Sequence, residues 1–439
     1  MSSLAEILKS KGKTITGSDG VASNVTKALE NIGIQVSIGQ KAENITPDTD
    51  LIVYTAAVKE DNPELMAARA SGIETVDRAA LVGMMMLEYK FPLSVAGTHG
   101  KTTTSSLVTE NFSLKQILIQ TVSIGGILPS IKGNYKVGGE DYFILETCEY
   151  CDSFLKFNPH GAIILNIDAD HLDYFKTLDN IYKSFNKFAN RLPEGGFLVI
   201  NNEIPRLSEV LEGVKAKVIT YGKDNTADWY PTDVTFNDLG HATYTVNHKG
   251  EKIAQVELSI PGMHNVYNSL SAFALATCYG VATEAIVKGI KNFTGTDRRF
   301  QFKGQFNGVN VIDDYAHHPT EIQATINSAR GTKLNKLWIM FQPHTYTRTY
   351  NHLDDFAKVL SEADHVILLD IYASREKDTG LVSSKDLRDK IEALGGVVTY
   401  CPTFNDAEKY AVDNCRKGDM LITMGAGDVY KIGEKLVSK

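Results

Sequence analysis

Short apolar runs, each followed by a polar or glycine-bearing turn, set the pattern of this chain. Residues 93–97 (LSVAG), 142–146 (YFILE) and 162–168 (AIILNID) are examples, and similar runs lie at 51–57, 197–202, 309–315, 337–343, 365–372 and 420–427. Many of these runs are continuous rather than alternating. Continuous apolar runs are typical of strands that are buried on both faces, as in parallel sheets covered by helices.

Amphipathic segments such as 351–363 and 383–396 lie between these runs and predict helices. Strands that alternate with helices favour an α/β, doubly wound architecture. Residues 224–260 break this rhythm because polar and apolar residues alternate there, which predicts a small antiparallel excursion.

The pattern divides into three blocks, which we interpret as three domains. Residues 1–89 form a small α/β unit, residues 90–295 a large central sheet, and residues 296–439 a further series of strands and helices. A length of 439 residues agrees with about three domains.

Polar clusters follow several of the predicted buried strands. The clusters read AGTHGKTTT, LETCEYCD, NIDADHLD, DDYAHHP, FQPHTYTR and MGAGD. Ligands of open α/β sheets bind beyond the carboxyl ends of the strands. The sequence therefore predicts a large polar site at these ends.

Composition narrows the range of functions. There are 45 Lys and Arg against 53 Asp and Glu, which gives a net charge of −8 and argues against broad nucleic-acid binding. No stretch has the length and hydrophobicity of a membrane span, and the first residues lack the features of a signal peptide. Five cysteines, an odd number in a long chain, suggest reduced thiols and a cytoplasmic protein.

The strongest motif is VAGTHGKTTT at 95–104. A strand should lead into Gly97 and the turn that follows it, and a helix should begin near Lys101. Glycines allow backbone N–H groups to approach phosphate oxygens, and the helix N-terminus adds positive charge. Lys101 could reach the β- and γ-phosphates and the Thr102 hydroxyl could ligate Mg²⁺. The spacing is not that of a strict Walker A motif.

Two residues at neighbouring strand ends could complete this site. Glu146 and His171 each follow an apolar run, although taken singly they could also be a helix cap and an ordinary polar residue. Cys148 and Cys151 form a single CxxC, which without a second ligand pair is weak evidence for zinc or redox chemistry.

Further candidates lie in the second half of the chain. Asn268 follows the start of a predicted helix and could read an adenine edge, whereas its neighbour Asn265 could simply cap that helix. Arg299 at the domain boundary could reach phosphates, or it could be a solvated residue. The ends of two further predicted strands carry Asp314, His317, His318, His344 and Arg348. Side chains of these types are suited to binding a ligand that has a carboxylate and an amine.

Together, these motifs resemble the Mur ligase family of ATP-dependent, amide-forming enzymes of peptidoglycan synthesis. GTHGKTTT, NIDADHLDYF, PGMHNVYNSLSA, DDYAHHPTEI, FQPHTYTRT and DIYASREKD occur in the family's order along the whole chain. The resemblance implies Rossmann-like N- and C-terminal domains around a central P-loop ATPase domain. GTHGKTTT with DDYAHHP points to the branch that joins L-alanine to UDP-N-acetylmuramate through an acyl phosphate.

The resemblance also implies roles for particular residues. Lys101, Glu146, His171 and Arg348 would be catalytic, and Thr102, Glu146 and His171 would organise Mg²⁺. Substrate contacts would come from Ser18, Asp19, His317, His344 and Arg348. ATP contacts would come from Gly97, Thr98, His99, Gly100, Lys101, Thr102, Thr103, Asn268, Arg299 and Asp314. The expected partners are small molecules, with no nucleic acid or membrane, in a monomer or homodimer.

The chain departs from this pattern in two places. Relatives begin with a strand and a glycine-rich turn of the type GIGGIGMSGLAEIL, whereas here Met1 falls on the methionine of that motif and Ser3 replaces its glycine. We therefore expect the first strand and diphosphate loop to be missing, with weak UDP-sugar binding unless the true start lies upstream. Residues 112–120 also differ from relatives, and a compensated frame slip in the gene would explain them.

Two alternative functions stay open at this point. One is the recycling reaction that joins a whole tripeptide to UDP-N-acetylmuramate, which shares most of the motifs. The other is a degenerate nucleotide-binding homologue.

Overall fold

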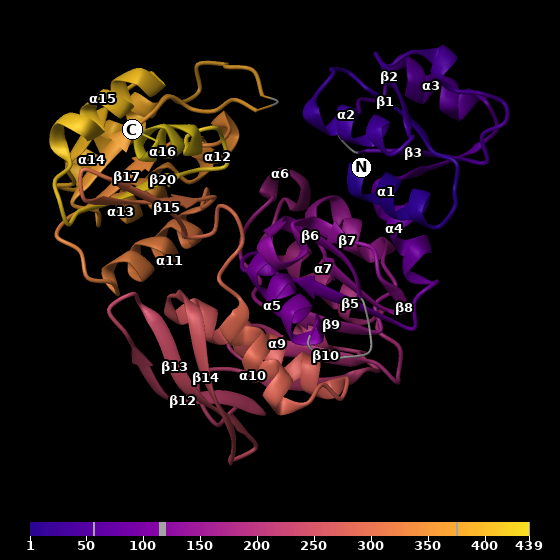
Figure 1. The fold of residues 1–439 in the computed structure, drawn as a ribbon, viewed down its shortest axis with the longest axis horizontal. Helices are drawn as coiled ribbons and strands as arrows, with labels where there is room; N and C mark the ends of the chain where they lie inside the picture. Colours follow the sequence, from indigo (N-terminus) through magenta and orange to yellow (C-terminus); the bar gives the residue numbers. More distant parts are fainter. Residues whose placement is uncertain (56–57, 114–119, 375, 439) are drawn as a thin grey trace. The chain divides into compact units, whose positions relative to one another are not determined.

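The computed structural model describes residues 1–55, 58–113, 120–374 and 376–438 (Figure 1). The chain divides into two compact units. The first consists of Met1–Gly222, Thr226–Asp228 and Ser271–Ile286, and the second of Lys223–Asn225, Trp229–Leu270 and Val287–Lys439. Of the helices in the described ranges, none has the length and hydrophobicity needed to cross a membrane.

Helix α1 is the first element of the described residues. Strands β1 and β2 form one parallel pair, and β3 and β4 form another. The elements of this region are α1 (Ser2–Ser10), β1 (Thr16–Asp19), α2 (Asn24–Asn31), β2 (Gln35–Ile38), η1 (Ala42–Asn44), β3 (Leu51–Tyr54), α3 (Pro63–Ala70), β4 (Glu74–Asp77) and α4 (Arg78–Met86).

A large sheet with β5 near its middle forms the centre of the first unit. The strands of this sheet that belong to the first unit follow the order β11-β10-β9-β5-β8-β6-β7. Strand β5 pairs in parallel with β8 on one side and with β9 on the other. The strands are β5 (Phe91–Ala96), β6 (Gln120–Leu128), β7 (Gly133–Lys136), β8 (Gly139–Glu146), β9 (Gly161–Ile164), β10 (Phe197–Asn201) and β11 (Lys217–Tyr221). Strand β9 is buried along its whole length, which explains its continuous apolar run.

Helices of the first unit follow these strands. Helix α7 buries Ile181, Phe185 and Phe188, which lie on one face because they are spaced four and three residues apart. The helices are α5 (Lys101–Ser113), η2 (Pro129–Ile131), η3 (Tyr150–Lys156), α6 (Leu172–Phe175), α7 (Leu178–Ala189) and α8 (Leu207–Leu211). Most of the segment 112–120, where we suspect a frame slip, lies outside the described residues.

The alternating segment forms an antiparallel meander in the second unit, as predicted. Strands β12 (Trp229–Phe236), β13 (His241–His248) and β14 (Glu251–Pro261) pair in sequence order. Helices α9 (Met263–Cys278) and α10 (Thr283–Asn292) follow β14. The predicted start of a helix shortly before Asn268 is therefore confirmed.

The C-terminal sheet has the order β15-β16-β20-β17-β18-β19, and only the β15–β16 pair is antiparallel. The strands are β15 (Gln301–Phe306), β16 (Val309–Asp314), β17 (Leu337–Phe341), β18 (His365–Leu368), β19 (Val398–Tyr400) and β20 (Met420–Met424). The helices are α11 (Pro319–Arg330), α12 (Tyr346–Asn351), α13 (Leu353–Leu360), α14 (Ser384–Ala393), α15 (Phe404–Asn414) and α16 (Tyr430–Val437).

Both faces of this sheet are covered by helices. Leu337, Ile339 and Phe341 pack in one apolar cluster with α11, α13 and α14, whereas Trp338 and Met340 pack in the other with α15 and α16. Successive side chains of a strand point to opposite faces, so a strand covered on both sides must be apolar throughout. The α/β architecture expected from the apolar runs is therefore confirmed.

The buried β20 should be sensitive to truncation. Ile422 is fully buried, and Ile422→Ala should lower the free energy of unfolding by about 2–5 kcal/mol, because it removes apolar contacts and leaves a cavity. Leu394→Ala is the control, since Leu394 is 58% exposed in the same unit, and it should change stability by less than about 0.5 kcal/mol. Urea unfolding measures both variants, and equal losses would contradict this account of the core.

Candidate active site

The Gly-Thr-His-Gly-Lys-Thr turn joins β5 to α5, as the sequence predicts. Gly97 has a φ of +136°, and a Cβ at this position would lie 2.9 Å from Leu165 Cβ and 3.1 Å from Leu165 N. Only glycine fits because the turn approaches the neighbouring chain so closely. The first hydrogen bond of α5 runs from the N–H of Thr104 to the carbonyl of Gly100 at 3.0 Å, so the N–H groups of residues 101–103 precede the bonded turns of the helix.

Asn166 holds this turn in place from the end of β9. The backbone N–H of His99 donates to Asn166 Oδ1 at 2.7 Å, and Asn166 Nδ2 donates back to the carbonyl of His99 at 3.0 Å. The N–H of Thr98 donates to the carbonyl of Asn166, and the Thr98 hydroxyl accepts from the N–H of Asp168. The N–H groups of Thr98 and His99 therefore already have partners within the protein, which leaves the start of α5 to supply donors for an anion.

Strand order explains why residues far apart in sequence meet at this turn. Strand β5 lies between β8 and β9, and Val95 is in register with Glu146 on β8 and with Ile163 on β9. The carboxyl ends of parallel neighbours lie at one edge of the sheet. Glu146 therefore emerges on one side of the turn, and Asn166 on the other.

Lys101 is folded back over the turn from which it starts. Its Nζ donates to the carbonyl oxygens of Gly97 (2.6 Å) and Thr98 (2.9 Å), and it lies 3.2 Å from Oε2 of Glu149. Burial by itself would lower the pKa of Lys101, but the negative charge of Glu149, with smaller contributions from Cys148 and Glu146, raises it above its ordinary value. The lysine is therefore fully charged at neutral pH.

His171 lies beside the same carboxylate. Its Nε2 is 4.0 Å from Glu149 Oε1 and 3.7 Å from Asp170 Oδ2, and its ring packs on Tyr150 with centroids 4.8 Å apart. His171 has a φ of +54°, a conformation that is costly for residues other than glycine. The structure thus brings together Lys101 and His171, as predicted, around Glu149.

Glu146 makes a different contact. Its carboxylate accepts a hydrogen bond from the N–H of Gly125 at 2.7 Å, at the carboxyl end of β8. Within the described residues, no group of three or more His, Cys, Asp or Glu side chains is arranged to hold a metal ion. The metal-binding role of Thr102, Glu146 and His171 stays a prediction.

No disulfide joins Cys148 and Cys151, the two cysteines of the CxxC pair, in this structure. Desolvation, and then the charge of Glu149, raise the pKa of Cys148 to about 11. A thiol with this pKa stays protonated at neutral pH, and it is the thiolate that binds metals or attacks.

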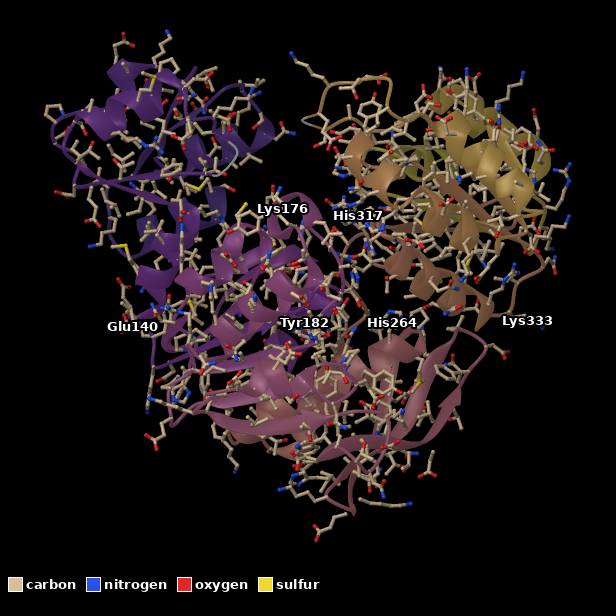
Figure 2. All side chains as sticks on the ribbon, turned by 180° about the vertical axis from the view of Figure 1, so that it is seen from behind. Glu140, Lys176, Tyr182, His264, His317 and Lys333 are labelled. Atoms are coloured by element: carbon tan, nitrogen blue, oxygen red, sulfur yellow. The ribbon has the colours of Figure 1, made fainter. Side chains whose placement is uncertain are left out.

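A second cluster of predicted residues lies in the second unit, where polar side chains follow β16 and β17. His317, which Figure 2 labels, lies after β16 with its Nδ1 3.3 Å from Glu321 Oε2. His344 follows β17, and its ring centroid is 5.9 Å from that of His317. His344 Nδ1 is 3.2 Å from Arg348 Nη1, so these three residues, which the family resemblance implies as substrate contacts, lie together.

Asp314 is held at the end of β16 by the backbone. Its carboxylate accepts hydrogen bonds from the N–H groups of Phe300 (2.8 Å) and Ala316 (2.7 Å). Burial raises the pKa of Asp314 to about 6, although the charge of Arg299 opposes this shift. Asn268, on α9, donates through Nδ2 to Asn265 Oδ1 at 3.0 Å.

The N-terminal region contains a cavity of about 580 Å³. It is lined by the predicted substrate residues Ser18 and Asp19, and also by Gln40, Thr55 and Asn62. Asn62 Nδ2 donates to Gln40 Oε1 at 2.6 Å, and the Ser18 hydroxyl donates to the carboxylate of Glu64. The two candidates thus lie on a polar concave surface.

Models of known protein families match nearly the whole chain. Residues 95–276 match the Mur ligase middle domain, residues 298–427 the Mur ligase glutamate ligase domain, and residues 1–90 the catalytic domain of the Mur ligase family. The chain belongs to the Mur ligase family.

Individual Mur ligases resemble the chain over its full length. The UDP-N-acetylmuramate–L-alanine ligase of Agathobacter rectalis is 51% identical, with 100% of this chain and 95% of that protein aligned. The ligase of the same name from Acetivibrio thermocellus is 47% identical over 99% and 92% of the two chains. The crystal structure of the Thermotoga maritima UDP-N-acetylmuramate–alanine ligase matches with a TM-score of 0.82 at 27% identity, covering 100% of this chain and 96% of that one.

Two residues of this Mur ligase site were not singled out from the sequence. Glu149 lies three residues after Glu146 in the same polar cluster, and Asn166 lies two residues after the end of β9. Each stands at the carboxyl end of a buried strand, so the same signal that pointed to Glu146 and His171 could have found them. What the sequence could not tell is which of several polar residues at one strand end faces the turn.

His344 should make stability depend on pH. Burial, followed by the charges of His317 and Arg348, lowers its pKa to about 4, whereas an unfolded histidine titrates near ~6.5. The unfolded chain binds more protons between these values, so the contribution of His344 is fully present above about pH 6.5 and is lost as the pH falls towards 4. In urea unfolding, His344→Asn should show a shallower decline in stability below about pH 6.5 than the wild type. An equally steep decline would refute this role of His344.

Proposed function

We infer that this Mur ligase joins L-alanine to UDP-N-acetylmuramate with the consumption of ATP, in peptidoglycan precursor synthesis. The observation that carries the inference is the turn at 97–102, placed at the carboxyl edge of a parallel sheet with its lysine, in a chain that is 51% identical along its length to a ligase of that name. Within the family resemblance, the γ-phosphoryl group passes to the lactyl carboxylate, and the amine of alanine then displaces phosphate.

The first unit supports the phosphoryl-transfer half of this reaction. Phosphoryl transfer needs positioning and neutralisation of charge more than covalent chemistry. The start of α5 offers N–H donors. The charged ammonium group of Lys101 can move from the carbonyl oxygens of its own turn to a phosphate oxygen. We assign ATP to this turn, with contacts from residues 97–103.

The donor set at the turn fits Mg²⁺. The Thr102 hydroxyl in the first turn of α5 and the Glu146 carboxylate on the neighbouring strand are hard oxygen ligands, which Mg²⁺ prefers in combination with phosphates and water. When bound, the ion neutralises charge on the β- and γ-oxygens. His171, which has Glu149 beside it, would orient groups around the bound ion.

The second unit supports recognition of the amino acid. Arg348 is a fixed positive charge that can pair with a carboxylate, and His344, with a pKa of about 4, is neutral at physiological pH and can accept or donate a hydrogen bond. We propose that Arg348, His344 and His317 form the alanine pocket. Asn268, Arg299 and Asp314 remain our candidates for further ATP contacts, and Ser18 and Asp19 for the UDP-sugar.

A phosphate-release assay tests the reaction. Phosphate release should require ATP, UDP-N-acetylmuramate and L-alanine together. Lys101→Ala should lower the rate of release by at least about a hundredfold, because the negative charge of the transferred phosphoryl group in the transition state loses its positive partner. The control is Lys215→Ala, an exposed lysine of the same unit. Release with the tripeptide alone as acceptor would favour the recycling reaction, and normal release by a folded Lys101→Ala protein would refute the assignment.

The proposed pocket predicts a selective defect. Arg348→Ala should raise the KM for L-alanine by roughly tenfold or more, since a charge-assisted hydrogen bond is lost, and should leave the KM for ATP nearly unchanged. Arg388→Ala removes an arginine that pairs only with its neighbour Asp389 among the ion pairs described, and should change neither constant. Steady-state kinetics decide the matter: a rise confined to the KM for ATP would overturn the pocket.

A further inference from the structure

The three N–H donors of the Lys101 ammonium group are matched by three acceptors. They are the carbonyl oxygens of Gly97 and Thr98 and the carboxylate of Glu149, at 2.6, 2.9 and 3.2 Å. An ammonium group has no further donor. A phosphate oxygen can therefore bind Lys101 Nζ only if one of these acceptors gives way.

Glu149 is the acceptor whose loss changes the charge balance. The two carbonyls belong to the turn itself and are neutral, whereas Glu149 carries a full negative charge and its side chain is only 3% exposed. A buried carboxylate that neutralises the lysine also repels an incoming polyphosphate, because like charges at close range in a poorly solvated site interact strongly.

The chain holds Glu149 at this place with a strained turn. Cys151 and Asp152, which follow it, both have left-handed backbones with φ of +55° and +53°. The carbonyl of Glu149 accepts from the N–H of Asp152, whose carboxylate accepts hydrogen bonds from the hydroxyls of Tyr174 (2.8 Å) and Ser184. A left-handed backbone conformation costs energy in residues other than glycine, so two such residues in a row persist only where the surrounding structure holds them. Residues of this kind cluster at functional sites.

We propose that Glu149 is a positioning residue that acts through Lys101: it holds the lysine withdrawn on its own turn, and a phosphate group must displace it to engage the lysine. In the nucleotide-free protein the ammonium is neutralised and folded back. On binding, Lys101 Nζ exchanges Glu149 for a phosphate oxygen, and His171, whose Nε2 lies 4.0 Å from the carboxylate, remains beside the Glu149 that is left behind. This inference rests on the proposed phosphate-binding role of Lys101.

The test is the affinity for inorganic tripolyphosphate without divalent cations, measured by calorimetry with chelator present. Glu149→Gln keeps the size of the side chain and removes its charge, so the full-length variant should bind tripolyphosphate roughly tenfold more tightly than the wild type. Glu149→Asp retains the charge and should bind close to the wild-type level. A variant that is merely loosened at this site would bind more weakly.

The control for the chemical change is Glu140→Gln. Glu140 is an exposed residue of β8, labelled in Figure 2, and its substitution should leave the affinity unchanged. Lys101→Ala separates the two inferences: if it binds tripolyphosphate as the wild type does, the phosphate role of Lys101 fails, whatever Glu149 does. If Lys101→Ala loses binding but Glu149→Gln binds no more tightly than the wild type, only the role of Glu149 is overturned.

A second measurement needs no substitution. In a crystal structure of the wild-type protein with tripolyphosphate, Lys101 Nζ should contact a phosphate oxygen and lie beyond hydrogen-bonding distance of Glu149. An ammonium group that stays bonded to the Glu149 carboxylate with phosphate in the site would overturn the proposal, even if Glu149→Gln does not fold.

Discussion

Parallel pairing of β5 with β8 on one side and β9 on the other is the constraint on which the first site depends. Parallel neighbours end at the same edge, so this pairing delivers the ends of three chain segments to one place. The turn after β5 contributes Lys101, the end of β8 contributes Glu146 and Glu149, and the end of β9 contributes Asn166. Apart from Glu146 and Glu149, which both come from the end of β8, these residues are far apart in sequence.

Close packing then determines the shape of the turn. Gly97 lies against Leu165 with no room for a side chain, and Asn166 engages the backbone of Thr98 and His99 on the side of β9. A turn held this firmly has its donors fixed before an anion arrives, which reduces the cost of ordering it on binding. Asn166 thus supports the predicted phosphate loop.

Charge is balanced differently in the two clusters. In the first unit, Lys101 is paired with a buried carboxylate, which raises its pKa and keeps it charged. In the second unit, Arg348 is in contact with His344, and burial together with the neighbouring positive charges keeps that histidine neutral. One cluster therefore holds a cation neutralised by a carboxylate near a helix start, and the other places an arginine beside a neutral histidine.

The α/β class, the antiparallel excursion at 224–260 and the strand-turn-helix around Lys101 could be predicted from the sequence because each depends on local periodicity and local turn chemistry. The strand-end pattern also placed His317, His344 and Arg348 among five candidate residues, and the family resemblance grouped these three as substrate contacts. Strand order, by contrast, is a property of the folded sheet, and it decides that the end of β8 and Asn166 meet at the turn. Glu146 and Glu149 follow the same strand and look equivalent along the chain. Only the backbone path after β8 decides that Glu149 lies against Lys101, whereas Glu146 accepts a hydrogen bond from Gly125.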